Sequence, residues 1–98
     1  MVYVTHENID AAKKVCKILI DCKLIACANL YPIESLYKWN GEFIDEKEVV
    51  SILKTDSKKW NKLKEKIETI HPYDTPCIGK IDAEYNQKFS KWIDSELL

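Results

Sequence analysis

The chain has no arginine, although fifteen of its 98 residues are lysine. Arginine supplies the flat, two-pronged donor group with which many proteins hold phosphate, carboxylate and guanine. Its absence argues against phosphatase, kinase and nucleic-acid-binding functions together. The lysines are balanced by sixteen acidic residues, so the net charge also gives no attraction to nucleic acid or to an anionic membrane.

Glycine is almost as scarce, with only Gly41 and Gly79. A phosphate-binding loop or a dinucleotide-binding turn needs several closely spaced glycines, and a Gly-x-Ser-x-Gly nucleophile turn needs two. None of these motifs is present, and the two histidines offer few general bases. We therefore predict that the protein is not an enzyme. The one covalent chemistry left open is a Cys27 thiolate beside His71.

Long apolar segments and paired cysteines are missing as well. No segment approaches the roughly 20 apolar residues that span a membrane. A basic segment followed by an apolar one, which would mark an export signal, is also absent. The four cysteines show no Cys-x-x-Cys spacing, which favours free, reduced thiols over disulfides. These features predict a cytoplasmic protein with no membrane partner.

The apolar periodicity predicts one α+β domain over residues 1–98. Trp60 and Trp92 share helical spacing with other apolar residues and are predicted to lie in the core. The expected elements are a strand at 2–5, a helix at 9–23, strands at 24–39 and 42–55, a second helix capped by Asp56 or Ser57, a strand at 77–83 and a C-terminal helix bearing Phe89, Trp92, Ile93 and Leu97. This βαββαβ order with an added helix is the ferredoxin-like arrangement.

Asn40-Gly41 lies between two strand-like segments and predicts a β-hairpin. Its arms of roughly 14 residues are long beside the usual 5–6, and Pro32 predicts an edge strand or a bulge in the first arm. The segment Val49–Leu53 is apolar on both faces, whereas two helices cover only one face of the sheet. We predict that the other face is buried in a closed homo-oligomer. The alternative is that the C-terminal helix covers it.

The segment His71–Pro76 places an imidazole, the phenol of Tyr73 and the carboxylate of Asp74 between and beside two prolines. A residue that precedes proline is disfavoured in the α region, so His71 is predicted to end the second helix. The segment is therefore either a binding site or a rigid structural corner.

Several separated segments resemble the CutA family, the divalent-cation tolerance proteins. The segments that carry the resemblance are Tyr3–Thr5, Ile25–Leu30, Ser35–Glu42, Glu48, Leu53–Thr55, His71–Pro76 and Trp92-Ile93. The resemblance implies a ferredoxin-like subunit in a homotrimer whose long hairpins interlock. It also implies a role in tolerance of copper and other divalent metals, with no catalytic reaction attached to the family.

The same resemblance implies that Cys27 and His71 lie at positions proposed to contact copper, and thiolate and imidazole suit copper or zinc. Cys77 and Asp74 are further possible ligands, so the expected cofactor is copper or another divalent cation, with no organic cofactor. Cys77 stands where the family often carries glutamate, and Val4 where some relatives carry a cysteine proposed as a copper ligand. The alternative is structural, with small or buried thiols and a histidine that ends a helix.

A signalling or adaptor trimer similar to the PII proteins is the second hypothesis. Tyr37, Trp39 and Tyr73 are large amphipathic side chains near turns, a type that anchors ligands and partners. Glu48 and Lys54 would add polar contacts in clefts between subunits. Alternatively, the aromatic side chains only hold the trimer together. The predicted partner is another copy of the chain, and no nucleic-acid partner is expected.

Overall fold

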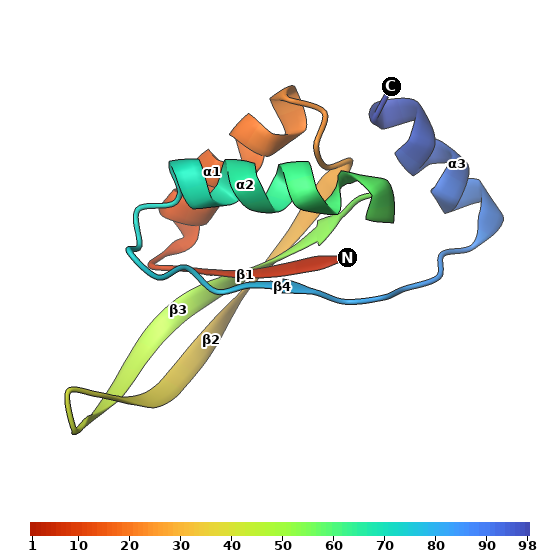
Figure 1. Cartoon of the computed structure of the whole chain (residues 1–98). Helices are drawn as coiled ribbons and strands as arrows, with labels where there is room; N and C mark the ends of the chain where they lie inside the picture. Colours follow the sequence, from red (N-terminus) through yellow and green to blue (C-terminus); the bar gives the residue numbers. More distant parts are fainter.

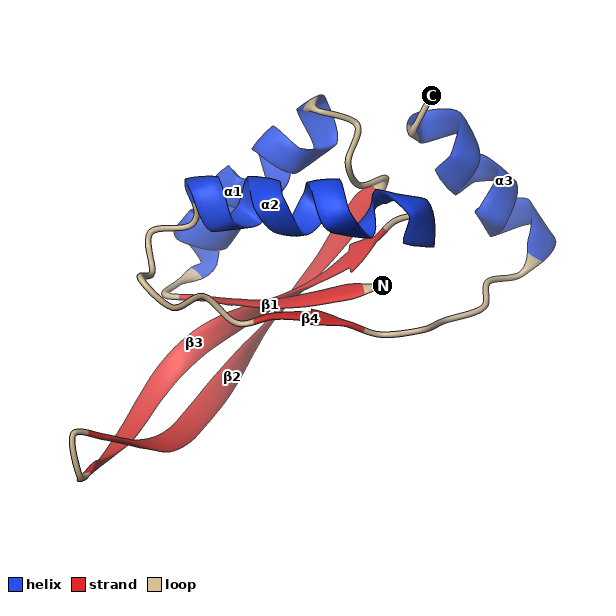
Figure 2. Cartoon of the chain, viewed as in Figure 1, coloured by secondary structure: helices blue, strands red, loops and turns tan.

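In the computed structural model, which describes residues 1–98, a four-stranded antiparallel sheet carries two helices on one face and a third helix near one end (Figures 1 and 2). The sheet order is β2-β3-β1-β4. The elements are β1 (Val2–His6), α1 (Ile9–Asp21), β2 (Cys27–Trp39), β3 (Glu42–Lys54), the 3₁₀ turn η1 (Ser57–Lys59), α2 (Trp60–Ile70), β4 (Ile78–Lys80) and α3 (Gln87–Glu96). The predicted ferredoxin-like α+β arrangement is confirmed.

Local sequence sets the ends of the first two helices. The Asn8 side chain accepts a hydrogen bond of 2.8 Å from the Ala11 backbone N–H and so caps α1. Asp56 accepts one of 2.8 Å from the Lys58 N–H and caps η1, which leads into α2. His71 ends α2 in an extended conformation, with φ −73° and ψ 135°, as the following proline requires.

The hydrophobic core lies between the sheet and α1 and α2. Alternate residues of β1, Val2, Val4 and His6, face the helices and are buried, whereas Tyr3 and Thr5 face the opposite side. The other members of the core are Val15, Cys16, Leu19, Ile25, Leu53, Leu63 and Ile67. Because β1 is central in the sheet, its helix-facing side chains pack in this core beside the C-terminal part of β3.

The β2–β3 hairpin is much longer than the strand beside it. The two arms pair from Cys27 with Lys54 to Trp39 with Glu42, whereas β1 pairs only with Val49–Leu53 of β3. The outer half of the hairpin, residues 33–48, is therefore a two-stranded ribbon that projects from the sheet (Figure 1). β2 forms an edge of the sheet, which accommodates Pro32.

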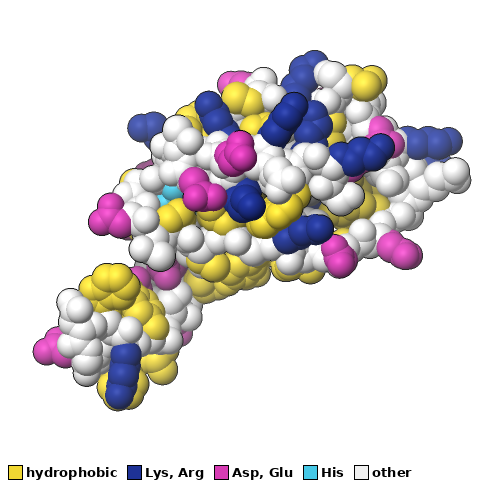
Figure 3. All heavy atoms as spheres, viewed as in Figure 1, with side chains coloured by type: hydrophobic (Ala, Val, Ile, Leu, Met, Phe, Trp, Pro, Cys, Tyr) yellow, Lys and Arg dark blue, Asp and Glu magenta, His cyan; other side chains and the backbone are white.

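The ribbon exposes large apolar side chains on both faces. Leu36 and Phe43 are 72% and 74% exposed on one face, and Trp39 is 60% exposed on the other. Figure 3 shows hydrophobic side chains gathered on the projecting lobe. In the segment that predicted burial against another subunit, Val50 is already buried within the chain and Ile52 is half-buried. Three of the four most exposed large hydrophobic side chains thus belong to the ribbon.

The alternative in which the C-terminal helix covers the open face of the sheet is wrong. Ile93 and Leu97 of α3 pack on Ala26, just before β2. Figure 1 shows α3 beside the other helices at the end of the sheet. Trp92, predicted to lie in the core, is 41% exposed because the buried face of α3 carries Ile93 and Leu97 instead.

The bounds of three elements also differ from the prediction, and the first is β2, which begins at Cys27 and not at residue 24. β4 covers only Ile78–Lys80, which pair with Val2–Val4 of β1. One further backbone hydrogen bond of 2.8 Å, from the Ile81 N–H to Met1 O, follows before the chain leaves for α3. α1 ends at Asp21, short of the predicted residue 23, and Cys22 beyond it is exposed.

The turn at the end of the ribbon generates the first prediction. Asn40 and Gly41 have φ of 52° and 81°, the combination that a type I′ turn requires. We expect Gly41→Ala to lower the free energy of unfolding by about 1–2 kcal/mol, the cost of a side chain in the left-handed region. Urea unfolding at a fixed protein concentration measures this change.

Asn40→Gly is the matched control for that variant, because glycine accepts the same φ without the steric cost. It should leave the urea midpoint close to that of the parent protein. A Gly41→Ala variant as stable as Asn40→Gly would contradict the assigned turn.

Candidate functional site

A cleft of about 640 Å³ lies where the ribbon meets the loop that follows α2. We call it the hairpin cleft and define it by its lining residues. These are Thr5, Glu7, Tyr37, Trp39, Ile44, Glu46, Glu48, Tyr73, Asp74, Thr75 and Cys77. Four of them are carboxylates, three are aromatic, and none is basic. The chain therefore places an acidic and aromatic surface at the base of its projecting ribbon.

Two phenol–carboxylate hydrogen bonds organise the hairpin cleft. The Tyr73 hydroxyl donates to Glu48 Oε2 at 2.8 Å, and the Tyr37 hydroxyl donates to Glu46 Oε1 at 2.7 Å. Burial, together with the hydrogen bond and charge of Glu48, raises the pKa of Tyr73. The hydrogen bond to Glu46 is the main cause that raises the pKa of Tyr37. Both phenols thus remain protonated donors, and Glu48 is held in place with only 8% of its surface exposed.

His71 connects the hairpin cleft to the core. Its Nε2 lies 2.8 Å from the Thr5 carbonyl oxygen, and its Nδ1 accepts a hydrogen bond of 3.1 Å from the Tyr73 backbone N–H. A carbonyl only accepts, so these partners assign the proton to Nε2 and a lone pair to Nδ1. The imidazole ring also lies edge-on to the Tyr73 ring, with centroids 4.7 Å apart. Both ring nitrogens of His71 are therefore engaged by the backbone, and the ring positions Tyr73.

His6 forms the buried end of the same network. It is 1% exposed and stacks on His71 with ring centroids 5.2 Å apart. Its Nε2 lies 2.8 Å from Ser51 Oγ, while its Nδ1 is buried without a hydrogen-bond partner. Burial, and then the neighbouring His71, lower the pKa of His6 to about 4, against a smaller raising effect of Glu48. His6 is thus neutral at neutral pH.

Sequence reasoning missed the His6–Ser51 pair, because Ser51 lies in a segment that is otherwise apolar. The pair becomes visible only through the register of β1 and β3, which places Val4 opposite Ser51. Although serine and histidine at this distance are typical of nucleophilic sites, Ser51 is fully buried. The pair therefore belongs to the core, where it satisfies polar groups between the sheet and the helices.

Cys27 and His71 are not brought together within one chain. Cys27 pairs with Lys54, whereas His71 contacts Thr5, whose partner in β3 is Val50. Four residues of β3 separate these positions, which corresponds to about 13 Å along the strand. The chain contains no group of three His, Cys, Asp or Glu side chains arranged to hold a metal ion.

Most of the other predicted site residues do meet. Tyr37, Trp39, Glu48 and Tyr73 all line the hairpin cleft, as do Asp74 and Cys77. Lys54 does not, because its ammonium group lies 5.3 Å from the centre of the Phe89 ring of α3. Glu46 and Glu7 join the cleft without having been predicted. Alternation along the β3 strand would have indicated Glu46, two residues from Glu48 on the same face.

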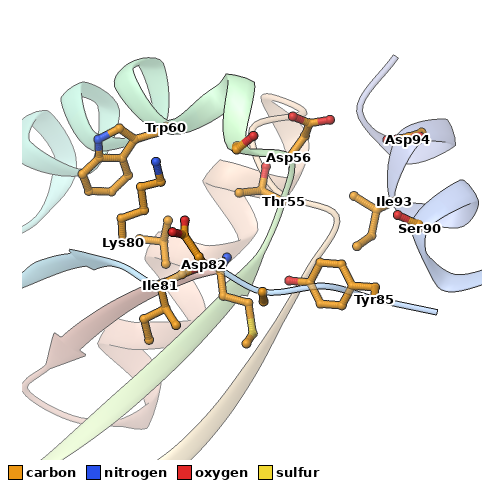
Figure 4. Close-up of a pocket in the computed structure, with 14 residues that line it drawn as sticks. Thr55, Asp56, Trp60, Lys80, Ile81, Asp82, Tyr85, Ser90, Ile93 and Asp94 are labelled. Carbon is orange, nitrogen blue, oxygen red and sulfur yellow. Dashed lines mark hydrogen bonds between the residues drawn. The ribbon is translucent and has the colours of Figure 1, made fainter. Parts of the chain in front are cut away.

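A second, smaller cavity of about 300 Å³ lies between the turn into α2, the segment after β4, and α3 (Figure 4). The Tyr85 hydroxyl points into it and is buried without a hydrogen-bond partner. Its charged lining residues have both signs and include Lys80, Asp56, Asp82 and Asp94. This mixed lining points to no particular ligand, in contrast to the uniformly acidic hairpin cleft. No helix of the chain has the length and apolar character needed to cross a membrane.

Comparison with known proteins identifies close relatives over nearly the whole chain. The family described as CutA1 divalent ion tolerance protein matches residues 1–96. The divalent-cation tolerance protein CutA of Pyrococcus horikoshii is 43% identical over 97 residues, which cover 98% of this chain and 95% of that protein. The corresponding protein of Thermococcus kodakarensis is 43% identical over 94 residues, covering 95% of this chain and 90% of that protein.

Solved structures give the same result. A crystal structure of Pyrococcus horikoshii CutA matches with a TM-score of 0.94 at 44% identity, covering 97% of this chain and 95% of that one. A CutA of Archaeoglobus fulgidus that is described as periplasmic matches with a TM-score of 0.94 at 34% identity, covering 99% and 96%. The PII-like protein CutA of Nostoc sp. PCC 7120 matches with a TM-score of 0.90 at 25% identity, covering 99% and 95%.

The low pKa of His6 gives the second prediction. Its pKa is about 4 in the folded protein and near its ordinary 6.5 in the unfolded chain, so the unfolded chain binds more protons between these values. The contribution of His6 is complete above pH 6.5 and is lost as the pH falls towards 4. We expect this loss to reach about 3 kcal/mol per subunit.

His6→Gln removes the titrating group and isolates the effect from the protonation of carboxylates. Urea unfolding of both proteins between pH 7.5 and pH 4 should show the parent losing more stability than the variant. If both proteins lost stability in parallel, the burial of a neutral His6 would not be a source of acid sensitivity.

Proposed function

The chain belongs to the CutA1 family of divalent ion tolerance proteins, and on that premise we propose that it acts in the cytoplasm as a homotrimer whose subunits join through their ribbons. The names of its relatives describe a tolerance function and no catalysed reaction. We therefore propose that the protein acts in tolerance of divalent cations. It would do so by assembling into a trimer and by binding a cation.

The exposed apolar surface of the ribbon is the observation that supports assembly. An isolated two-stranded hairpin is marginally stable in water, yet this ribbon exposes Leu36 and Phe43, which share one face of it, over most of their surfaces. Packing against further copies of the chain would remove those side chains from water and support the strands. A closed ring of three subunits would leave no ribbon unpaired.

The carboxylates of the hairpin cleft support cation binding. Glu46, Glu48 and Asp74 supply oxygen ligands of the kind that divalent cations bind, and Cys77 adds a thiol that suits copper. The predicted ligands Cys27 and His71 would need donors from a second subunit, and His71 would have to give up its hydrogen bond from Tyr73. We therefore propose the hairpin cleft, with Asp74 and Cys77, as the metal site, where the ligands would have to move together because no group of three is arranged to hold an ion within one subunit.

A specific observation favours a second candidate function, the binding of a small molecule in a cleft between subunits. Tyr37, Trp39 and Tyr73 bring aromatic surface to the hairpin cleft, and a metal ion has no need of it. A relative in Nostoc is described as PII-like. In this candidate the trimer is a signalling or adaptor protein, and its ligand, not a metal, carries the information.

Assembly gives the third prediction. Native mass spectrometry of the purified protein should show a species of three times 11.5 kDa. Phe43→Asp places a charge in the proposed apolar interface, where an unpaired charge costs several kcal/mol, and should shift the mass to that of the monomer. Lys14→Asp, on the exposed side of α1, is the control and should leave the mass unchanged. A monomeric parent, or a trimeric Phe43→Asp variant, would contradict the proposed interface.

Metal binding gives the fourth prediction, tested on a matched pair of thiols. The chelator-treated protein should bind one copper ion per subunit in a calorimetric titration. Cys77→Ser should weaken that binding at least tenfold, because it removes the soft ligand of the cleft, whereas Cys27→Ser should not. If Cys27→Ser alone abolished binding, the site would lie at the start of β2. If the parent bound no copper, the metal half of the proposal would be wrong.

A further inference from the structure

We propose that the hairpin cleft binds a small organic ammonium ion, held by Glu46 and Glu48 and enclosed by the rings of Tyr37, Trp39 and Tyr73. This inference rests on the second candidate of the proposed function, because it specifies the chemical class of the small molecule. Three observations lead to it: an uncompensated buried carboxylate, a lining without basic groups, and aromatic rings beside the carboxylates.

The charge of Glu48 has no counterpart in the chain. Glu48 is only 8% exposed. The hydrogen bond that its carboxylate accepts comes from the neutral Tyr73 hydroxyl. The nearby imidazoles are His6, which is neutral at neutral pH, and His71, whose ring nitrogens are both engaged. A buried carboxylate without a cation is unfavourable. A cationic ligand would supply the missing charge.

The other charged residues that line the hairpin cleft also favour a cation. Glu46 lies two residues from Glu48 on the same face of β3, about 7 Å away along the strand. Glu7 and Asp74 come from the ends of other segments and also line the cleft. Four negative charges facing one hollow repel one another, and no lysine or histidine stands among them. Any anionic or neutral ligand would leave that repulsion in place.

The aromatic rings distinguish an organic ammonium ion from a metal ion. A divalent metal ion requires several ligand atoms around it at short distances, and no group of three suitable side chains is so arranged. An ammonium ion requires only nearby negative charge and the faces of aromatic rings, which attract cations. Tyr37 and Tyr73 each hold a carboxylate by hydrogen bond, so rings and charges are fixed together. Trp39, 60% exposed, adds the ring type that attracts cations most strongly.

The size of the hairpin cleft suits a small molecule. Its volume of about 640 Å³ falls within the range of roughly 300–1,000 Å³ that is common for ligand pockets. The walls come from β1, from the ribbon and from the loop after α2, and His71 fixes the loop through the Tyr73 backbone. The cleft is therefore partly preformed, which lowers the entropic cost of binding.

Choline and its neutral isostere 3,3-dimethylbutan-1-ol are the probes that test this inference, since they differ in charge and hardly in shape. Each is titrated into the assembled protein and followed by isothermal calorimetry at pH 7.5. We expect choline to saturate one site per subunit and the neutral alcohol to bind at least tenfold more weakly. Glu48→Gln and Trp39→Leu should each weaken choline binding at least tenfold. Glu68→Gln, on the exposed side of α2, is the control and should have no effect.

The outcomes separate this inference from the proposals on which it depends. Equal binding of choline and the alcohol would overturn it, as would choline binding that ignores both cleft variants. Copper binding that depends on Cys77, combined with no choline binding, would overturn it and keep the metal site. Native mass spectrometry of the same sample tests the trimer by itself, so a failed assembly and a failed ligand assignment are distinguishable.

Discussion

The structure depends on a mismatch between two neighbouring strands. β3 has thirteen residues, whereas β1, the strand that covers its inner half, has five. The pairing of β1 ends at Val49, and beyond that residue the hairpin has no third strand and no helix against it. This one constraint creates the projecting ribbon, exposes its apolar side chains on both faces, and leaves an angle at its base. The hairpin cleft occupies that angle.

A second feature, the corner after α2, closes the cleft and links it to the core. Proline at position 72 ends the helix at His71, whose ring then bonds the Thr5 carbonyl and the Tyr73 N–H. Tyr73 in turn holds Glu48, and His6 stacks on the buried side of His71. The proline that ends the helix thus places His71 and Tyr73 in a continuous series of contacts from the core to the acidic surface. The proposed specificity for a cation follows from this series of contacts, because the contacts leave Glu48 buried and without a cation.

Much of this arrangement could be predicted from the sequence. Apolar periodicity, the Asn40-Gly41 turn and the proline after His71 are local patterns, and each led to the correct element. The cleft residues Tyr37, Trp39 and Tyr73 were recognised by their type and their place near turns. Local patterns do not indicate which residues from distant parts of the sequence come together in space. Within one chain, the β3 residues beside Cys27 and beside the strand position that His71 contacts are about 13 Å apart, and Lys54 lies against Phe89 of α3. The position of α3 depended on packing at Ala26, which periodicity does not reveal.

The central claim is that contacts between subunits support the ribbon, and amide hydrogen exchange along it tests that claim most directly. The backbone N–H groups of residues 33–48 should be protected as strongly as those of Val49–Leu53 when the protein is concentrated, and should lose that protection on dilution. Fast exchange over the ribbon at every concentration, beside a protected inner sheet, would show that the ribbon stands alone and would contradict the account.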